Sequence, residues 1–126
     1  MIHDEIVSGI YQKIKTVLPT TNVFKYYSNV AGERIVILVK SNDLAFTIQS
    51  VVVWVSIYVP LLNGLVDSIK NNHLKESIET AINSSISLPS GIVWNVKVST
   101  IAGPIVDPET PAESLQILKI SLEARS

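Results

Sequence analysis

The segment from residue 44 to residue 60 constrains the fold more than any other part of the sequence. Its apolar side chains recur at every second position, which is the period of a β-strand and not of a helix. From residue 51 onward, one parity holds Val51, Val53, Val55, Ile57 and Val59. The other parity includes Trp54 and Tyr58, so the strand presents apolar groups on both faces. We therefore expect a long strand that is covered on two sides.

The same segment predicts one arm of a hairpin. Before residue 49 the apolar residues have the opposite parity and are Leu44, Phe46 and Ile48. This switch of parity predicts a β-bulge or a break near Gln49–Ser50. A β-branched run at 35–39 precedes a polar turn at 41–43. Residues 33–60 are therefore expected to form a long, protruding β-hairpin with its tip at 41–43.

Two segments have the period of an amphipathic helix. Residues 3–18 carry an apolar stripe at steps of three and four, and Pro19 ends the helix. The stripe consists of Ile2, Ile6, Ile10, Ile14 and Val17. A second helix is expected from a cap at Asn71–Asn72, after a connection at 61–72, and it ends before Pro89. Its stripe consists of Leu74, Ile78, Ala81, Ile82 and Ile86.

Three further strands complete the expected sheet, at 23–27, 92–98 and 118–124. A loop with three prolines, at 102–111, separates the last two. The element order is therefore α-β-β-β-α-β-β. Strands joined by hairpins, with the helices segregated from them, predict an α+β fold with a mostly antiparallel sheet and two helices on one face. A chain of 126 residues fits a single domain that spans residues 1–126.

The composition predicts that the chain associates with other protein chains. Apolar residues make up 47% of the sequence and charged residues only 17%, against roughly 25% charged in a typical domain. Because a small monomer has a limited interior, part of this apolar surface is expected to close against another chain. A monomer that leaves one apolar sheet face open is the alternative.

Catalytic and metal-binding chemistry is not indicated. Cysteine is absent, which excludes thiolate metal sites, disulfides and cysteine nucleophiles. The two histidines, His3 and His73, lie at the starts of the two expected helices, where helix-end polarity accounts for them. No glycine-rich phosphate loop or nucleophile elbow is present in the sequence. We expect no enzymatic activity and no cofactor.

Nucleic acid and membrane are not expected as partners. Ten basic and eleven acidic residues leave a formal charge of −1, and the basic residues are scattered along the sequence. The apolar run 51–62 is too short for a bilayer helix, which needs about 20 residues. A different class of function stays open, namely a small ligand-binding module with an apolar pocket near Trp54 and Trp94.

Two segments together carry a resemblance to a known family. The first is the valine-rich strand 51–60, which ends in Tyr58-Val59-Pro60, and the second is the helical segment 74–82. With the leading helix, the hairpin and two last strands around a loop, the chain resembles the tail-terminator and tail-completion proteins of long-tailed bacteriophages. Related neck and head–tail connector proteins have the same element order. The resemblance lies in apolar patterns over nearly the whole chain.

The resemblance implies a structural protein of the virion tail or neck, assembled in the cytoplasm of a bacterial host. Its subunits would form a homohexameric ring that caps the tail tube and meets the tail tube protein and the head-side connector. It implies no catalytic residues. Two surfaces are candidates for these interfaces, the hairpin tip and the loop 103–113. Their candidate residues are Lys40, Asp43, Leu44, Phe46 and Ile48 in the hairpin and Asp107 and Glu109 in the loop.

Overall fold

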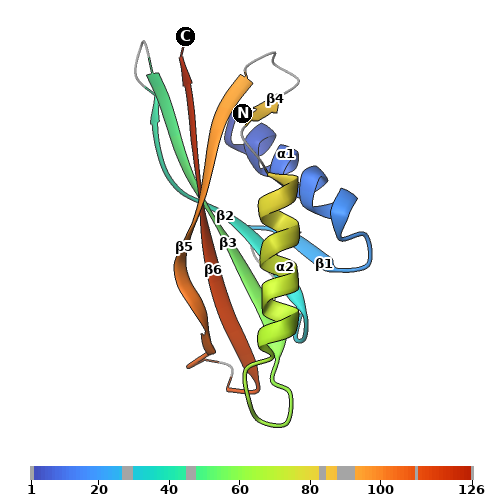
Figure 1. Cartoon of the computed structure of the whole chain (residues 1–126). Coiled ribbons are helices and arrows are strands. Elements are labelled where there is room, and N and C mark those ends of the chain that lie inside the picture. The colour runs from blue at the N-terminus through green and yellow to red at the C-terminus, as the bar shows by residue number, and fades with distance from the viewer. Residues whose placement is uncertain are drawn as a thin grey trace.

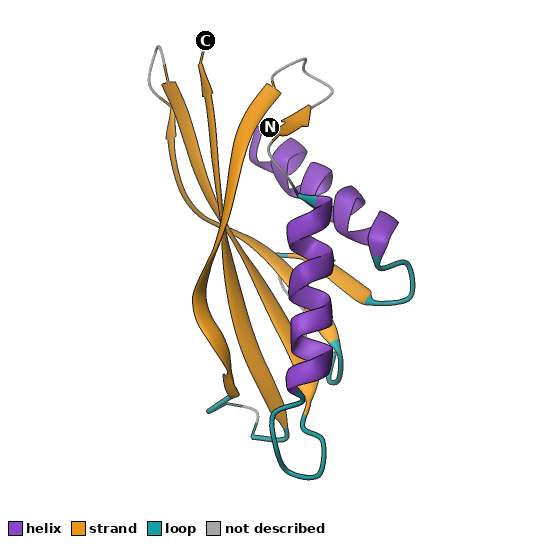
Figure 2. Cartoon of the chain, viewed as in Figure 1, coloured by secondary structure: helices purple, strands orange, loops and turns teal. Residues whose placement is uncertain are grey.

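The computed structural model describes residues 2–26, 30–44, 48–82, 85–87, 93–109 and 111–125. Figure 1 labels the elements along the chain, and Figure 2 separates helices from strands. The two helices are α1 (Ile2–Val17) and α2 (Ser68–Ala81). The strands are β1 (Asn22–Lys25), β2 (Arg34–Leu44), β3 (Ile48–Pro60), β4 (Ser85–Ser87), β5 (Val93–Val106) and β6 (Glu113–Arg125).

The six strands form one sheet in the order β1-β2-β3-β6-β5-β4. Its centre is the antiparallel pair β3 and β6, in register from Ile48 opposite Arg125 to Pro60 opposite Glu113. Only the short pair β1 and β2 is parallel among the pairings of the described strands. The α+β fold and the predicted element order are confirmed, with the three-residue strand β4 as an addition.

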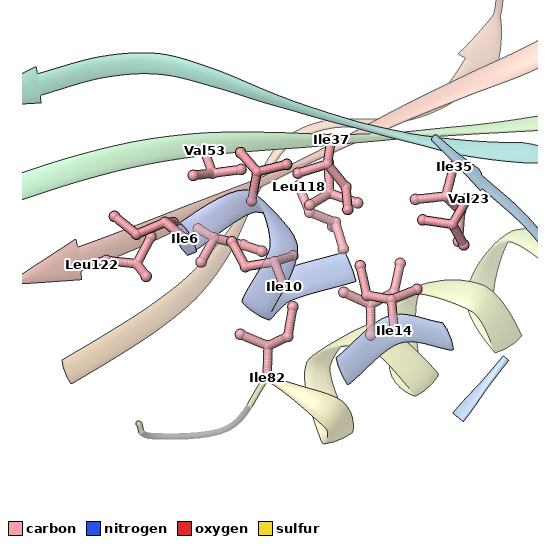
Figure 3. Close-up of a cluster of buried hydrophobic side chains, with 14 of the residues drawn as sticks. Ile6, Ile10, Ile14, Val23, Ile35, Ile37, Val53, Ile82, Leu118 and Leu122 are labelled. Atoms are coloured by element: carbon pink, nitrogen blue, oxygen red, sulfur yellow. The ribbon is translucent and has the colours of Figure 1, made fainter. Parts of the chain in front are cut away.

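The core forms between the helices and one face of the sheet. The stripe of α1 places Ile6, Ile10 and Ile14 in full burial. They face sheet residues of the opposite layer, as Figure 3 shows for Ile37, Val53 and Leu118. From α2, Leu74 and Ile78 add to the same cluster. The buried side of each helix repeats every 3.6 residues, and the buried side of each strand repeats every two residues. Because both sides contribute to the same core, both periods are visible in the sequence.

Both helices lie on the same face of the sheet (Figure 2). Along β3 the side chains toward the helices are buried, whereas Val52, Trp54, Ser56 and Tyr58 are only half-buried. No described element of the chain covers these side chains. The expectation that the strand would be covered on two sides is therefore wrong for the single chain, because the two helices reach one face only.

The hairpin differs from its prediction in two details. β3 pairs with β6 without a shift through Gln49 and Ser50, so no bulge lies there. The shift lies instead in β2, between Val39 and Ser41. β2 also continues through the expected turn, because residues 41–44 pair with 49–52 of β3. Ser41, Asn42 and Asp43 have turn propensity, but the long partner strand supplies the hydrogen bonds that keep them extended.

The second helix and the last loop also differ from their predictions. Asp67 caps α2, since its carboxylate accepts a hydrogen bond from the backbone N–H of Lys70 at 3.0 Å. The helix therefore begins before Asn71, which is buried within it, and it ends at Ala81. β5 extends to Val106, into the region expected as a loop, and the register shift between Ala102 and Ile105 accommodates Gly103 and Pro104.

We expect Ile10→Ala to lower the free energy of unfolding by about 3 kcal/mol, because the change leaves a cavity under the sheet. The control is Val17→Ala on the same helix, where the side chain is 41% exposed and the expected loss is below about 0.5 kcal/mol. Urea denaturation of the two variants measures both values. Equal losses in both would contradict the placement of the α1 stripe in the core.

Candidate interaction surface

The face of the sheet opposite the helices, which we call the open face, is apolar and aromatic with basic side chains between. Residues directly opposite each other in a ladder share a face, so Leu38, Trp54 and Lys119 form one row across β2, β3 and β6. Further members of this face are Val36, Val52, Ser56, Tyr58, Lys97, Ser99, Leu115, Ile117 and Ser121. Leu38 is 37% exposed.

Two aromatic rings of the open face are each contacted by a cation. The Lys40 ammonium lies 4.5 Å from the centroid of the Trp54 ring. The Arg34 guanidinium carbon lies 4.0 Å from the centroid of the Tyr58 ring. Such pairs hold the long basic side chains flat against the sheet. Aromatic residues and arginine are the types that protein–protein interfaces favour.

Arg34 also belongs to a buried ion pair that joins the ends of β2 and β6. Its Nη1 lies 2.6 Å from Oε2 of Glu113, and both side chains are almost fully buried. The backbone N–H of Gly32 donates to Glu113 Oε1 at 3.1 Å, and Arg34 Nη1 donates to the carbonyl oxygen of Gly32 at 2.8 Å. Gly32 has a φ of 93°, which glycine adopts without strain. Glu113 is therefore structural, although it lies in the loop predicted as an interface.

Asp107 is likewise turned inward. Its carboxylate accepts a hydrogen bond from the backbone N–H of Glu109 at 3.0 Å, and its own N–H donates to the carbonyl oxygen of Glu113 at 2.9 Å. The residue is only 6% exposed. Of the two predicted loop residues, Asp107 is therefore buried in the single chain, whereas Glu109 is exposed. Aspartate often accepts a hydrogen bond from the backbone two residues later in a turn. The sequence alone does not distinguish such an aspartate from one that is exposed in a loop.

The predicted hairpin residues lie at the other end of the molecule. The ladder places Asp43 opposite Ser50, Leu44 opposite Gln49 and Ile48 opposite Arg125. Lys40 is exposed, while Phe46 lies outside the described residues. The twelve steps of β3 from residue 48 to residue 60 correspond to roughly 40 Å. The hairpin and the 107–113 loop are therefore separate surfaces, as Figure 1 shows.

A group of exposed apolar side chains, which sequence reasoning missed, gathers around the 107–113 loop. It consists of Leu62, Leu65, Ile69, Ile105 and Val106. The connection 61–67 reaches this end because the N–H of Leu61 donates to the carbonyl oxygen of Ala112 at 3.0 Å. Ile69, in the first turn of α2, is 87% exposed. In the sequence this group is visible only as Leu62 and Leu65 within the connection between β3 and α2. Local patterns do not show that these leucines lie beside the end of β5.

Two of the open hollows among the described residues bear on the ligand-binding alternative. One, of about 430 Å³, lies over β6 between β3 and β5 and includes Val52 and Lys97. The other, of about 520 Å³, lies between α2 and β5, where Ile69, Pro104 and the buried Gln116 line it. Trp94 is fully buried on the helix side of the sheet, whereas Trp54 belongs to the open face. These two residues therefore do not share a pocket.

The described residues contain no group of three acidic or histidine side chains placed to hold a metal ion. Neither described helix is long and apolar enough to span a bilayer.

The comparisons with known proteins support the fold and name no activity. No family model matches the sequence, and no curated protein matches it. Eighteen chains of solved structures match the fold. One of them, whose name states no function, superposes with a TM-score of 0.68 over 99% of this chain and 94% of its own, at 13% sequence identity. At this identity the likeness shows the α+β fold alone.

We expect Glu113→Ala to lower the free energy of unfolding by about 3 kcal/mol, since it leaves the Arg34 charge buried without its partner. Glu109→Ala is the matched control, because its side chain is exposed and its effect is expected within about 0.5 kcal/mol. Chemical denaturation of both variants at neutral pH compares them. A stability loss no larger in Glu113→Ala than in the control would contradict the importance of the buried pair.

The raised pKa of Tyr58 predicts that the free energy of unfolding decreases at high pH. Burial raises the pKa of its hydroxyl above the usual 10.0, and the Asp107 carboxylate raises it further, while Arg34 lowers it in part. The pKa of the Tyr58 hydroxyl is higher in the folded state than in the unfolded state. Its contribution to stability is therefore fully present at pH values below the unfolded-state pKa, and it is lost as the pH rises through the folded-state pKa. We expect denaturation midpoints to fall above about pH 10. Tyr58→Phe removes this part of the slope, and an unchanged slope would contradict the assignment.

Proposed function

We propose that this protein is a subunit of a homo-oligomeric ring of the tail-terminator or head–tail joining type found in long-tailed bacteriophages. It acts through protein–protein interfaces and carries out no covalent chemistry. The ring caps the tail tube and presents a surface to the head-side connector. The proposal rests on the resemblance in element order and apolar pattern, together with the uncovered surfaces of the single chain.

One observation carries the proposal, namely that the two helices cover only one face of the sheet. The other face exposes a mixture of apolar, aromatic and basic side chains around Trp54 and Tyr58. A second apolar group lies at the end that includes Leu65 and Ile69. Surfaces of this kind are typical of protein interfaces, because closing them against another chain removes apolar area from water.

The hairpin and the 107–113 loop are two separate surfaces, as the contacts within a ring require. In a ring each subunit uses one surface to meet its neighbour on one side and a different surface to meet the neighbour on the other side. The sheet of this chain separates such surfaces along its length, since the hairpin and the 107–113 loop lie at opposite ends (Figure 1). Repetition of one contact then satisfies every subunit, and closure stops further growth.

A small ligand-binding module is the second candidate. The hollow between α2 and β5 favours it, because Gln116 lines that hollow and its Oε1 has no hydrogen-bond partner among the described residues. An amide-bearing ligand would supply a donor to this oxygen. A rise in melting temperature with such ligands, in a chain that stays monomeric, would favour this function over the ring.

The proposed function is tested by the mass and shape of the purified chain. Size-exclusion chromatography with light scattering, over a wide range of protein concentration, is expected to give a discrete multiple of the 13.8 kDa subunit. Negative-stain electron microscopy is expected to show rings. A stable monomer at all concentrations, alone and with a tail tube protein, would contradict the proposal.

We expect Leu38→Asp to weaken self-association about tenfold or more, because it places a charge in the apolar open face. The melting temperature is expected to change little, since the Leu38 side chain is not part of the buried core. Val17→Asp, on the helix layer, is the control for an exposed apolar residue. Sedimentation analysis measures association, and an identical constant for both variants would show that the open face is not the interface.

A further inference from the structure

The fold gathers basic residues that are far apart in the sequence into a row on the open face. Lys119 lies directly between Trp54 of β3 and Ser99 of β5. Lys97 is two residues from Ser99 and so lies diagonally beside Lys119. On the other side, Lys40 extends over the Trp54 ring. We call Lys40, Lys97 and Lys119 the basic row.

Among the side chains that the structure describes, no carboxylate forms an ion pair with the basic row. The ion pairs of the described side chains involve Arg34, Lys70 and Lys75, and none of the three lysines of the row. Two acidic residues lie beside the row in the ladder. Glu123 is opposite Asn95 and diagonal to Lys97, and Asp43 is opposite Ser50 on the same face. Both acidic residues lie in the ladder row of Ser50, toward the hairpin end, so the three lysines leave an excess of positive charge around Trp54 in the middle of the open face.

The end of the molecule around the 107–113 loop has the opposite character. Five acidic and two basic side chains of the described residues meet there: Glu33, Asp67, Asp107, Glu109 and Glu113 against Arg34 and Lys70. Arg34 pairs with Glu113 and Lys70 pairs with Glu33. Asp67, Asp107 and Glu109 form no ion pair with a described basic side chain, and of these Glu109 is exposed. We call this surface, with its exposed Leu62, Leu65, Ile105 and Val106, the acidic end.

A single chain cannot bring these two surfaces together. Trp54 and Pro60 are six residue steps apart along β3, which corresponds to roughly 20 Å along the central ladder. The Debye length at physiological salt is only about 8 Å, so the acidic end does not neutralise the basic row of its own subunit. The two surfaces are complementary in charge, and both carry exposed apolar side chains beside the charges.

We propose that the acidic end of one copy of this chain docks on the basic row of the next copy. Glu109 approaches Lys119 and Lys97, and the apolar residues beside Glu109 cover Leu38, Val52 and Ile117 of the open face. This contact joins two different surfaces, so its repetition forms a ring when the rotation between neighbouring copies closes. The inference rests on the proposed ring function and adds the pair of surfaces that meet.

A second copy fits the basic row better than nucleic acid does. Three lysines with Glu123 beside them offer few phosphate contacts, whereas binding to a nucleic-acid backbone uses a larger basic stripe. The apolar side chains Leu38, Val52 and Ile117 match an apolar partner and not a phosphate backbone. The acidic end supplies both the carboxylate and the apolar groups that this face requires.

Charge exchange between copies tests the contact. Lys119→Glu alone and Glu109→Lys alone are each expected to weaken self-association about tenfold, measured by light scattering and sedimentation at low salt. An equimolar mixture of the two variants is expected to restore assembly, because each altered face then meets an altered end. The double variant is expected to assemble by itself. Lys40→Glu is a second row variant in case Lys119→Glu fails to fold, which circular dichroism checks.

Lys13→Glu on α1 is the matched control, since it makes the same charge change on the helix layer and is expected to leave association unchanged. Single-stranded and duplex oligonucleotides added to the parent chain test the other occupant, and salt-sensitive binding that Lys119→Glu abolishes would overturn the proposal. If the parent chain assembles but neither single variant weakens assembly, this contact alone is wrong. The same conclusion follows if the mixture of the two variants does not restore assembly. A parent chain that stays monomeric overturns the ring function as well.

Discussion

Two helices can cover only one face of a six-stranded sheet, and the remaining structure follows from this constraint. α1 and α2 bury the isoleucines of their stripes against the residues of β3 and β6 that face them. The central ladder from residue 48 to residue 60 is rigid because it pairs with β6 over its full length. No described element covers the opposite face, which carries Leu38 and the half-buried Trp54 and Tyr58. Aromatic residues of this kind are enriched in protein interfaces.

The second organising interaction is the ion pair between Arg34 and Glu113. It ties the start of β2 to the start of β6, and the hydrogen bond from Gly32 completes it. Because this pair uses Arg34, the neighbouring Asp107 and Glu109 carboxylates have no ion-pair partner among the described side chains. The same interaction that stabilises the end of the sheet therefore leaves that end acidic, while the lysines of the open face lie elsewhere along the sheet.

Much of the fold was predictable because each periodic pattern is satisfied locally. The α1 stripe, the alternation of β3 and the hairpin of β2 and β3 were all predicted from spacing. The predicted ends of strands and helices were wrong where tertiary pairing overrides local propensity. Residues 41–44, for example, pair with β3 despite their turn-like sequence. The surfaces were harder to predict, because burial of Asp107 and exposure of Leu65 depend on which segments meet at one end of the sheet.

By itself the sequence determined the class of the fold, the excess of apolar β-surface and the lack of a recognisable catalytic motif, since these depend on composition and on spacing within single elements. Only the tertiary structure decided which apolar residues stay in solvent and how charges are distributed. Lys40, Lys97 and Lys119 are separated by many residues, and only strand register brings them onto one face. Neighbours across a sheet are set by pairing between distant segments, which no local pattern specifies.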